Sequence, residues 1–290
     1  MRQSTLMLFA VVFAATASPP GHAAQSYDSC TGTISSLPAV VNTQGVYCLK
    51  NDLATVQSSG AAIDVQAHNV TIDCNGFKLG GLGGGTASTA VGIDGSGTAN
   101  LTVRGCNIRG FRFGVLTDAT SGGGHLVEDN RFDGVREIAV QLYGDGSTIR
   151  RNQMLDTGAG STLASAYVAG VRALGNIDVV DNQISVVLGD PDAAAYAIGI
   201  FHETGSGGQI LGNSVSGVTA SATGYSYGIV AFSSGVLIRD NSLSGEPANS
   251  LFAIGCTTTD PLTVAKDNVA FGFAALIESC GNAGGNTLWN

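Results

Sequence analysis

The stretch "LIRDNSLSG" at residues 237–245 decides the fold of this chain, because close copies of it keep returning. The copies share a few apolar or polar residues, an Asn, an apolar residue and often a Gly. They are "LTVRGCNIRG" (101–110), "LVEDNRFDG" (126–134), "TIRRNQMLD" (148–156), "VVDNQIS" (179–185), "ILGNSVSG" (210–217) and "TVAKDNVAFG" (263–272). A phrase repeated in this way predicts a solenoid, in which one structural unit stacks on its own copies.

The recurring Asn sets the period of the repeat. The aligned positions, 22 to 31 residues apart, are Asn107, Asn130, Asn152, Asn182, Asn213, Asn241 and Asn268. A second motif falls between them, as "VGID" (91–94), "FGVLTD" (113–118), "IAVQLY" (138–143), "AGVRAL" (169–174), "IGIFHE" (198–203) and "YGIVAF" (227–232). Alternating apolar residues rich in Val and Ile favour strands over helices. Each repeat is therefore expected to hold two short strands plus turns.

Coiling such units produces a right-handed parallel β-helix, an all-β solenoid, of about eight to nine rungs. Each strand would lie on its copy in the next rung, about 4.8 Å away, with Ile and Val stacked inside. The Asn would tolerate a left-handed backbone at the corner. Its amide would also donate to one neighbouring rung and accept from the other. Every rung would thus need the same corner, which explains why the phrase returns.

The pattern N-x-I-x-x-G followed by G-[IV] resembles the right-handed parallel β-helix repeat of the pectate-lyase-like superfamily, over roughly residues 60–285. The opening "GVYCLKNDL…GAAIDVQAHNVTIDCNGFKLGG" (45–81) is similar to the first rungs and cap of bacterial right-handed β-helix proteins. Those proteins include periplasmic copper-site accessory proteins and mannuronan epimerases. The resemblance implies the fold, whereas one fold hosts many functions. The expected division is a cap at 25–59 and a β-helix domain at 60–290.

The first residues indicate export. Arg2, an apolar run from Leu6 to Ala15 and the small-residue stretch that follows predict a signal peptide at 1–24, cleaved after Ala23 or Ala24. The expected location is secreted or periplasmic. The formal charge is 13 − 22 = −9, or 12 − 22 = −10 without Arg2. An acidic chain argues against a nucleic-acid partner, and no long apolar stretch remains that would indicate a membrane partner.

Six Cys in an exported chain predict three disulfides. Cys74 and Cys106 each precede an Asn at equivalent corners, so their Cα atoms should lie about 5 Å apart. "FAIGC" (252–256) aligns with "ALIESC" (275–280), which pairs Cys256 with Cys280. Cys30 and Cys48 would then close the cap. The alternatives are free buried thiols or a metal cluster, which the absence of a C-x-x-C spacing disfavours. No metal and no cofactor are expected.

The second motif supplies a candidate functional face. If Ile and Val point inward, the following residue points outward. That gives two outward columns, the first Asp94, Leu116, Gln141, Arg172, Phe201 and Val230, the second Ser96, Asp118, Tyr143, Leu174, Glu203 and Phe232. The rung spacing is close to the length of one sugar unit, so aromatic rings and polar groups on this face could follow a polysaccharide. The alternative is an ordinary solvated sheet face.

Two sets of site residues follow from these columns. The expected substrate-binding residues are Asp94, Gln141, Tyr143 and Phe201, and the expected catalytic residues are Arg172, His202, Glu203 and Asp118. A His–Glu pair could serve as acid and base, although strict alternation would turn His202 inward as a core histidine. Of the other histidines, His125, in a Gly-rich loop, is expected to be exposed, and His68 is expected at the surface.

Several enzyme signatures of the superfamily are missing from this sequence. Only "NID" (176–178) faintly resembles the first motif of the polygalacturonases, and no pectate-lyase Asp/Arg set is found. The leading interpretation is therefore recognition of an extracellular or cell-wall polysaccharide along the solenoid. Two alternatives stay open, a lyase or C5-epimerase acting on a uronate polymer and a non-catalytic periplasmic scaffold. Loss of turnover in Arg172→Ala would favour the first of these, and loss of affinity in Phe201→Ala or Tyr143→Ala would favour recognition.

Overall fold

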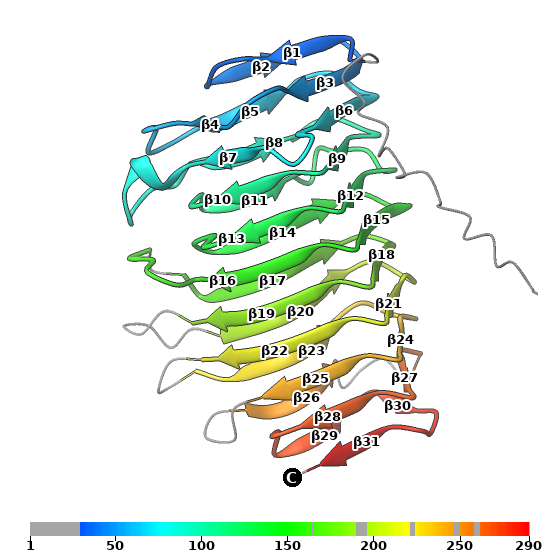
Figure 1. Cartoon of the computed structure of the whole chain (residues 1–290). Coiled ribbons are helices and arrows are strands. Elements are labelled where there is room, and N and C mark those ends of the chain that lie inside the picture. The colour runs from blue at the N-terminus through cyan, green and yellow to red at the C-terminus, as the bar shows by residue number, and fades with distance from the viewer. Residues whose placement is uncertain are drawn as a thin grey trace, which may run out of the picture.

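The chain coils into a stack of rungs, seen edge-on in Figure 1 from β1 near one end to β31 at the other. This computed structural model describes residues 30–163, 165–189, 196–220, 224–245, 250–257 and 262–289. The strands form three parallel sheets, so the right-handed parallel β-helix expected from the sequence is confirmed. The expected signal peptide, 1–24, lies outside the described residues.

The first sheet has 11 strands. In spatial order they are β1 (Gly32–Ile34), β3 (Gly45–Leu49), β6 (Val70–Asp73), β9 (Thr102–Arg104), β12 (Leu126–Glu128), β15 (Ser147–Arg150), β18 (Ile177–Val180), β21 (Gln209–Leu211), β24 (Leu237–Arg239), β27 (Val264–Lys266) and β30 (Gly281–Asn282).

The second sheet has 10 strands and continues each rung after a sharp corner. They are β4 (Leu53–Ala54), β7 (Lys78–Gly80), β10 (Asn107–Arg109), β13 (Arg131–Asp133), β16 (Gln153–Thr157), β19 (Gln183–Leu188), β22 (Ser214–Thr219), β25 (Ser242–Gly245), β28 (Val269–Phe271) and β31 (Thr287–Trp289). Between β7 and the next strand, a single 3-10 turn, η2 (Leu82–Gly84), is the one helical segment among the described residues.

The third sheet also has 10 strands and closes each rung. They are β2 (Ala39–Val41), β5 (Ala61–Val65), β8 (Val91–Asp94), β11 (Phe113–Leu116), β14 (Ile138–Tyr143), β17 (Tyr167–Leu174), β20 (Tyr196–Thr204), β23 (Ser226–Ala231), β26 (Ser250–Cys256) and β29 (Ala275–Glu278). β1 to β4, from the region expected as a cap, pair in the same three sheets as the later strands.

Each rung contains three strands, which corrects the expectation of two. The recurring phrase itself holds two of them: in "LVEDNRFDG", β12 ends at Glu128 and β13 begins at Arg131, with a two-residue corner between. The sequence alone reads as one strand there because the corner is only two residues long, Asp129 and Asn130, and leaves no stretch of turn residues between the strands. The inward residues of all three sheets, such as Val127, Phe132 and Val140, are fully buried in one continuous core.

An Asn ladder runs along the corner between the first and second sheets. Its members are Asn130, Asn152, Asn182, Asn213, Asn241, Asn268 and Asn286. Each Asn donates two hydrogen bonds to the Oδ1 of the Asn in the next rung, one from its side-chain Nδ2 and one from its backbone N–H. At Asn152, for example, these two donors reach the Oδ1 of Asn182 at 3.0 and 3.0 Å. The expected amide ladder is therefore present.

Two details of the expected corner are wrong. Cys106, not Asn107, occupies the ladder position, because the Cys106 N–H donates to the Oδ1 of Asn130 while Asn107 already lies in β10. The left-handed residue is also not the Asn but its predecessor: Asp129, Arg151 and Asp240 have φ of 55°, 53° and 57°. The Asn must instead turn its amide inward, where it is almost fully buried.

The three expected disulfides are present. Cys30–Cys48 and Cys74–Cys106 lie near the N-terminal end of the solenoid, and Cys256–Cys280 lies near the other end. The Cα atoms of Cys74 and Cys106 are 4.7 Å apart, as stacked rungs require. This pair stands where the Asn ladder stops, so a covalent link replaces the amide bonds between those rungs.

Candidate functional site

The outer face of the third sheet carries the first outward column as the sequence predicts it. The paired residues along the axis are Asp64, Asp94, Leu116, Gln141, Arg172, Phe201, Val230, Gly255 and Glu278. The column is mostly polar from Asp64 to Arg172, is apolar at Phe201 and Val230, and ends on Gly255 and Glu278. A change of character along one face marks the C-terminal half of this sheet as different from an ordinary solvated surface.

A second apolar cluster lies outside the interior of the solenoid, on the outer face of the third sheet. Its buried members are Ile138, Ala169, Ile198, Phe201 and Val230, and they are separate from the main core. They face outward because the alternation is broken once in each strand: two adjacent residues both face inward, so the residues on either side of that pair both face outward. In β23, Gly228 and Ile229 point to the interior, so Tyr227 before them and Val230 after them both lie on the outside.

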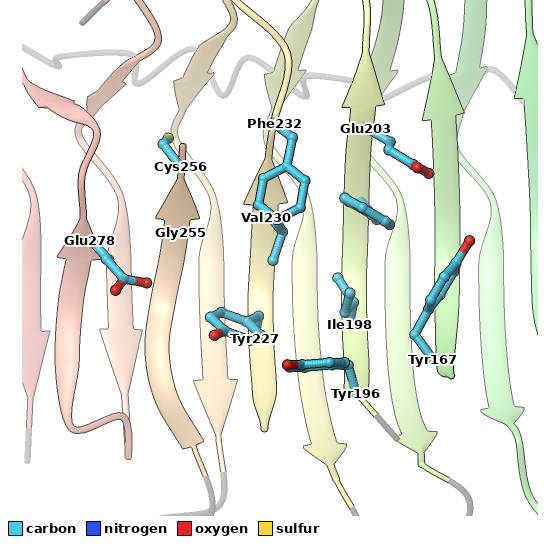
Figure 2. A pocket seen from close by; sticks show the side chains of 11 residues that line it. Tyr167, Tyr196, Ile198, Glu203, Tyr227, Val230, Phe232, Gly255, Cys256 and Glu278 are labelled. Carbon is cyan, nitrogen blue, oxygen red and sulfur yellow. The ribbon is translucent and has the colours of Figure 1, made fainter. Parts of the chain in front are cut away.

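Three of them, Ile198, Phe201 and Val230, form the floor of a groove of about 440 Å³ over β17, β20, β23, β26 and β29. It is lined by Tyr167, Tyr196, Ile198, Phe201, Glu203, Tyr227, Val230, Phe232, Gly255, Cys256 and Glu278 (Figure 2). The rings of Tyr196, Tyr227 and Phe232 lie between two carboxylates: Glu278 on one side, and Glu203, extending toward the strand of Tyr167, on the other.

The aromatic rings are arranged as a connected set. Phe201 makes edge-to-face contacts with Tyr167 and Phe232, with centroids 5.6 and 5.3 Å apart. Tyr196 lies 6.4 Å from Tyr227 in a tilted arrangement. Phe232 is 52% and Tyr196 42% exposed, so both rings present apolar faces to solvent while the rings beneath hold them in place. Exposed rings on a buried apolar floor are typical of a binding surface.

At the Glu203 end, the charged groups neutralise one another. The Arg172 Nε donates to Glu203 Oε2 at 2.6 Å, and its Nη1 donates to Gln141 Oε1 at 2.9 Å. The guanidinium also lies over the Tyr167 ring, 5.3 Å from its centroid. Burial, with a smaller contribution from Glu203, raises the pKa of Tyr167 to about 12. Arg172 therefore serves as the centre of a hydrogen-bonded cluster.

At the other end, Glu278 faces Tyr227 across a missing side chain. Gly255 belongs to the outward column, and a Cβ there would lie 3.4 Å from Tyr227 Cδ1 and 3.8 Å from Glu278 Oε2. Figure 2 shows Glu278 extending toward the strand of Gly255, with the Tyr227 ring beyond it. Burial and the negative charge of Glu278 both raise the pKa of Tyr227.

Of the eight site residues predicted from the sequence, the structure brings four together. Gln141, Arg172 and Glu203 are joined by hydrogen bonds, and Phe201 pairs with Arg172 in the adjacent strand. The other four, described next, are Asp94, Asp118, Tyr143 and His202. Glu203 itself sits at a β-bulge, because Leu174 pairs with Thr204 instead of Glu203.

Asp94, Asp118 and Tyr143 lie outside the groove lining. Asp94 Oδ1 accepts from the backbone and hydroxyl of Ser96 at 3.0 and 2.6 Å, which closes a turn. Asp118 binds the hydroxyl of Thr120 at 2.6 Å, and this hydrogen bond holds the pKa of the carboxyl below its usual value. Both aspartates order their own loops.

His202 points into the interior, as strict alternation implies. Its ring is fully buried, with Nδ1 2.6 Å from Ser233 Oγ and Nε2 3.1 Å from the carbonyl of Ile177. Burial lowers its pKa. A polymer on the outer face cannot reach this ring, so its pairing with Glu203 as acid and base is not supported by the geometry.

His125 corrects another expectation, that a Gly-rich loop leaves its histidine exposed. The ring is 1% exposed, and Nδ1 accepts the Leu101 N–H at 3.2 Å. His68, expected at the surface, is exposed. Within the described ranges, no three His, Cys, Asp or Glu side chains are grouped as a metal site.

The sequence interpretation missed Tyr167, Tyr196, Tyr227 and Glu278 as groove residues. Tyr196 and Tyr227 both precede the inward pair of their strands, in "AYAIGIF" and "SYGIVAF". Strict alternation hides their outward direction, because it does not allow for two consecutive inward residues. Glu278 could have been found by extending the outward column through the aligned "FAIGC" and "ALIESC".

The three parallel sheets define a right-handed parallel β-solenoid, and comparisons with known proteins agree with this fold. Residues 39–189 match the family described as "Right handed beta helix region", and the chain belongs to that family. No curated protein sequence matches the chain. No helix among the described residues is long and apolar enough to cross a membrane.

Solved structures with the same fold are distant in sequence. The tailspike protein of E. coli bacteriophage HK620, in complex with a pentasaccharide, is 10% identical with a TM-score of 0.55, covering 92% of this chain and 61% of its own. A double mutant of that tailspike gives 12% identity and a TM-score of 0.53, covering 91% of this chain and 60% of its own. The A-module of an Azotobacter vinelandii mannuronan C-5 epimerase, at 12% identity and TM-score 0.40, covers 84% and 83%. This chain thus spans about 61% of the length of the tailspike it matches, and the likeness to the two tailspike structures shows the fold alone.

Proposed function

We propose that this chain is an exported protein that binds an extended polysaccharide in the aromatic groove of the third sheet. The observation that carries the proposal is the pair of exposed rings, Tyr196 and Phe232, above a buried apolar floor. Aromatic rings present large apolar faces at low entropic cost, and the faces of sugar rings pack against them. The flanking carboxylates, Glu203 and Glu278, are hydrogen-bond acceptors for hydroxyl groups.

The dimensions of the groove suit an oligosaccharide. It crosses five successive strands from β17 to β29, or about 19 Å at roughly 4.8 Å per rung. That length accommodates four to five sugar units, at about one per rung. The HK620 tailspike supports the proposal in a limited way, since it shares the fold and its structure is described as a complex with a pentasaccharide.

The geometry favours recognition over turnover. Glu203 and Glu278 lie three rungs apart, or about 14 Å along the axis, whereas paired carboxylates of glycosidases stand roughly 5–10 Å apart. Arg172 is held by Glu203 and Gln141, and His202 is buried behind the sheet. Neither of these two residues, which the sequence offered for proton transfer, is therefore presented to a sugar in the groove.

Three disulfides support the proposed location outside the cytoplasm. Disulfides persist in oxidising compartments, such as the periplasm and the extracellular space. The structure links Cys30–Cys48, Cys74–Cys106 and Cys256–Cys280. The signal peptide proposed at 1–24 would deliver the chain to such a compartment, and N-terminal sequencing of the mature protein would locate its cleavage site.

Proton NMR of a polysaccharide panel in deuterated buffer tests the proposal. Binding should broaden the lines of one polymer, with no unsaturated ends, new reducing ends or exchange at C5. Phe232→Ala and Tyr196→Ala should each weaken affinity about tenfold. Phe271→Ala is the matched control, because Phe271 is 44% exposed but lies on the second sheet. New chemical products, or no broadening by any polymer, would overturn recognition without turnover.

A further inference from the structure

We propose that the C-terminal part of the groove is a subsite for a protonated amino group, so that the glycan it selects carries amino sugars rather than uronates. This inference rests on the proposed function and names its ligand class. Its elements are the Glu278 carboxylate, the rings of Tyr196 and Tyr227, and the open position at Gly255.

The charges of the groove are one-sided. Its lining contains two charged residues, Glu203 and Glu278, and both are acidic. Glu203 is balanced by Arg172, which shares a hydrogen bond with it at 2.6 Å. Glu278 has no ion pair among the described residues, and its charge is felt at Tyr227, whose pKa it helps to raise. A cation bound beside Tyr227 would supply the charge that Glu278 lacks.

The Tyr227 ring, which faces Glu278 across Gly255, suits the same cation, and Tyr196 lies beyond it on β20. Tyr227 stacks on Phe252 with an interplanar angle of 15° and lies 6.4 Å from Tyr196. An ammonium within about 6 Å of an aromatic face is attracted by the ring quadrupole. A carboxylate beside such rings strengthens that attraction, since the site is partly shielded from water. Tyr196 and Tyr227 come from the neighbouring strands β20 and β23, so the parallel pairing of these strands sets the spacing of the two rings.

Gly255 provides the space for the group. Every other member of the outward column from Gln141 to Glu278 carries a side chain, and Gly255 leaves open the position between Tyr227 and Glu278. Its φ is not in the left-handed region, so the backbone does not require glycine there. The missing side chain at Gly255 therefore opens space in the groove, and the backbone conformation of the strand does not depend on it.

A uronate would meet the opposite situation. Its carboxylate would stand near Glu278 with no Lys, Arg or His among the residues lining the groove. Juxtaposed like charges are strongly unfavourable, and the net charge of −9 adds long-range repulsion of a polyanion. The same groove thus favours a protonated amine and disfavours a carboxylate, so it distinguishes the two ligand classes by the sign of their charge.

Calorimetric titration with three hexamers tests this subsite: glucosamine, N-acetylglucosamine and galacturonate, at a pH where the amines are protonated. The glucosamine hexamer should bind at least tenfold more tightly than the galacturonate hexamer, and added salt should narrow the difference. Glu278→Gln should weaken glucosamine binding about tenfold while leaving the N-acetylated hexamer within about twofold. Asp240→Asn is the control, because this exposed carboxylate lies at the opposite corner.

The outcomes separate this inference from the proposed function. Equal or tighter binding of galacturonate, or an unchanged ratio of amine to N-acetyl affinity in Glu278→Gln, overturns the amine subsite. Binding of other polymers in the NMR panel, without any of the three hexamers, also overturns it and leaves recognition standing. Failure of every hexamer and every panel polymer to bind removes both proposals together.

Discussion

At the scale of single residues, the corner position of each rung places the strictest requirement on its side chain, which must both donate and accept hydrogen bonds. Asn182 donates to the carbonyls of Ile149 and Val180 and to the Oδ1 of Asn213, while its own Oδ1 accepts two bonds from Asn152. No other side chain offers two donor hydrogens and one acceptor oxygen in so short a shape. The sequence repeats Asn because the corner needs both functions at once.

Asn182→Ala should lower the free energy of unfolding by about 3 kcal/mol, because it strands several buried partners without hydrogen bonds. Asn286→Ala, at the half-exposed end of the ladder, should cost about 1 kcal/mol, since water reaches the groups it leaves behind. Urea unfolding followed by circular dichroism measures both. Equal decreases in the free energy of unfolding at the two positions would contradict the idea that the stabilisation by each ladder Asn depends on its burial.

Val186 is a second residue-scale case, since it is β-branched yet has φ of 62°. The left-handed conformation costs an L-residue roughly 1–2 kcal/mol, partly offset in a Gly variant by the entropy of the unfolded chain. Val186→Gly should therefore raise the free energy of unfolding by up to about 1 kcal/mol. Val187→Gly, at the fully buried neighbour, should lower it by a few kcal/mol. A loss of stability in Val186→Gly would show that packing outweighs the strain.

At the scale of the elements, β26 determines how open the groove is. Gly255→Val should fill the gap between Tyr227 and Glu278, with its methyl groups meeting the Tyr227 ring. Because Gly255 faces outward in a strand, a β-branched residue suits the backbone and the melting temperature should stay nearly constant. Glycan affinity should fall at least tenfold. Titration calorimetry of the panel ligand measures this, and unchanged affinity would place the ligand elsewhere.

The same elements show what the sequence could predict. The outward column Gln141, Arg172, Phe201 follows from the aligned motifs, because stacked parallel strands keep residue spacing from rung to rung. The tyrosines do not follow, since Gly228 and Ile229 both face inward and shift Tyr227 to the outside. Asn107 was misplaced by one position because Cys106 fills its corner. Periodicity thus predicts the stacking, whereas local bends decide which side chains meet.

At the scale of the whole molecule, two buried histidines link the solenoid to pH. Burial lowers the pKa of His125 and of His202, which lie in different rungs. The carbonyls of Gly122 and Ile177 act in the opposite direction, as does the nearby charge of Asp178, and burial outweighs them. Because stability in a stacked array depends on neighbouring rungs, protonation at either site weakens the rungs on both sides.

The sign of the pH effect follows from proton counting. The unfolded chain takes up protons on these histidines at about pH 6.5 and the folded chain only at lower pH. Stability should therefore be fully present above about pH 6.5 and decline as the pH falls from there toward the folded pKa values, by up to about 1.4 kcal/mol per unit for each histidine. Urea unfolding across this range should show the decline. His202→Gln should reduce its slope by up to half. A slope that His202→Gln does not alter would mean that this histidine titrates alike in both states, contrary to its full burial against Ser233 and Ile177.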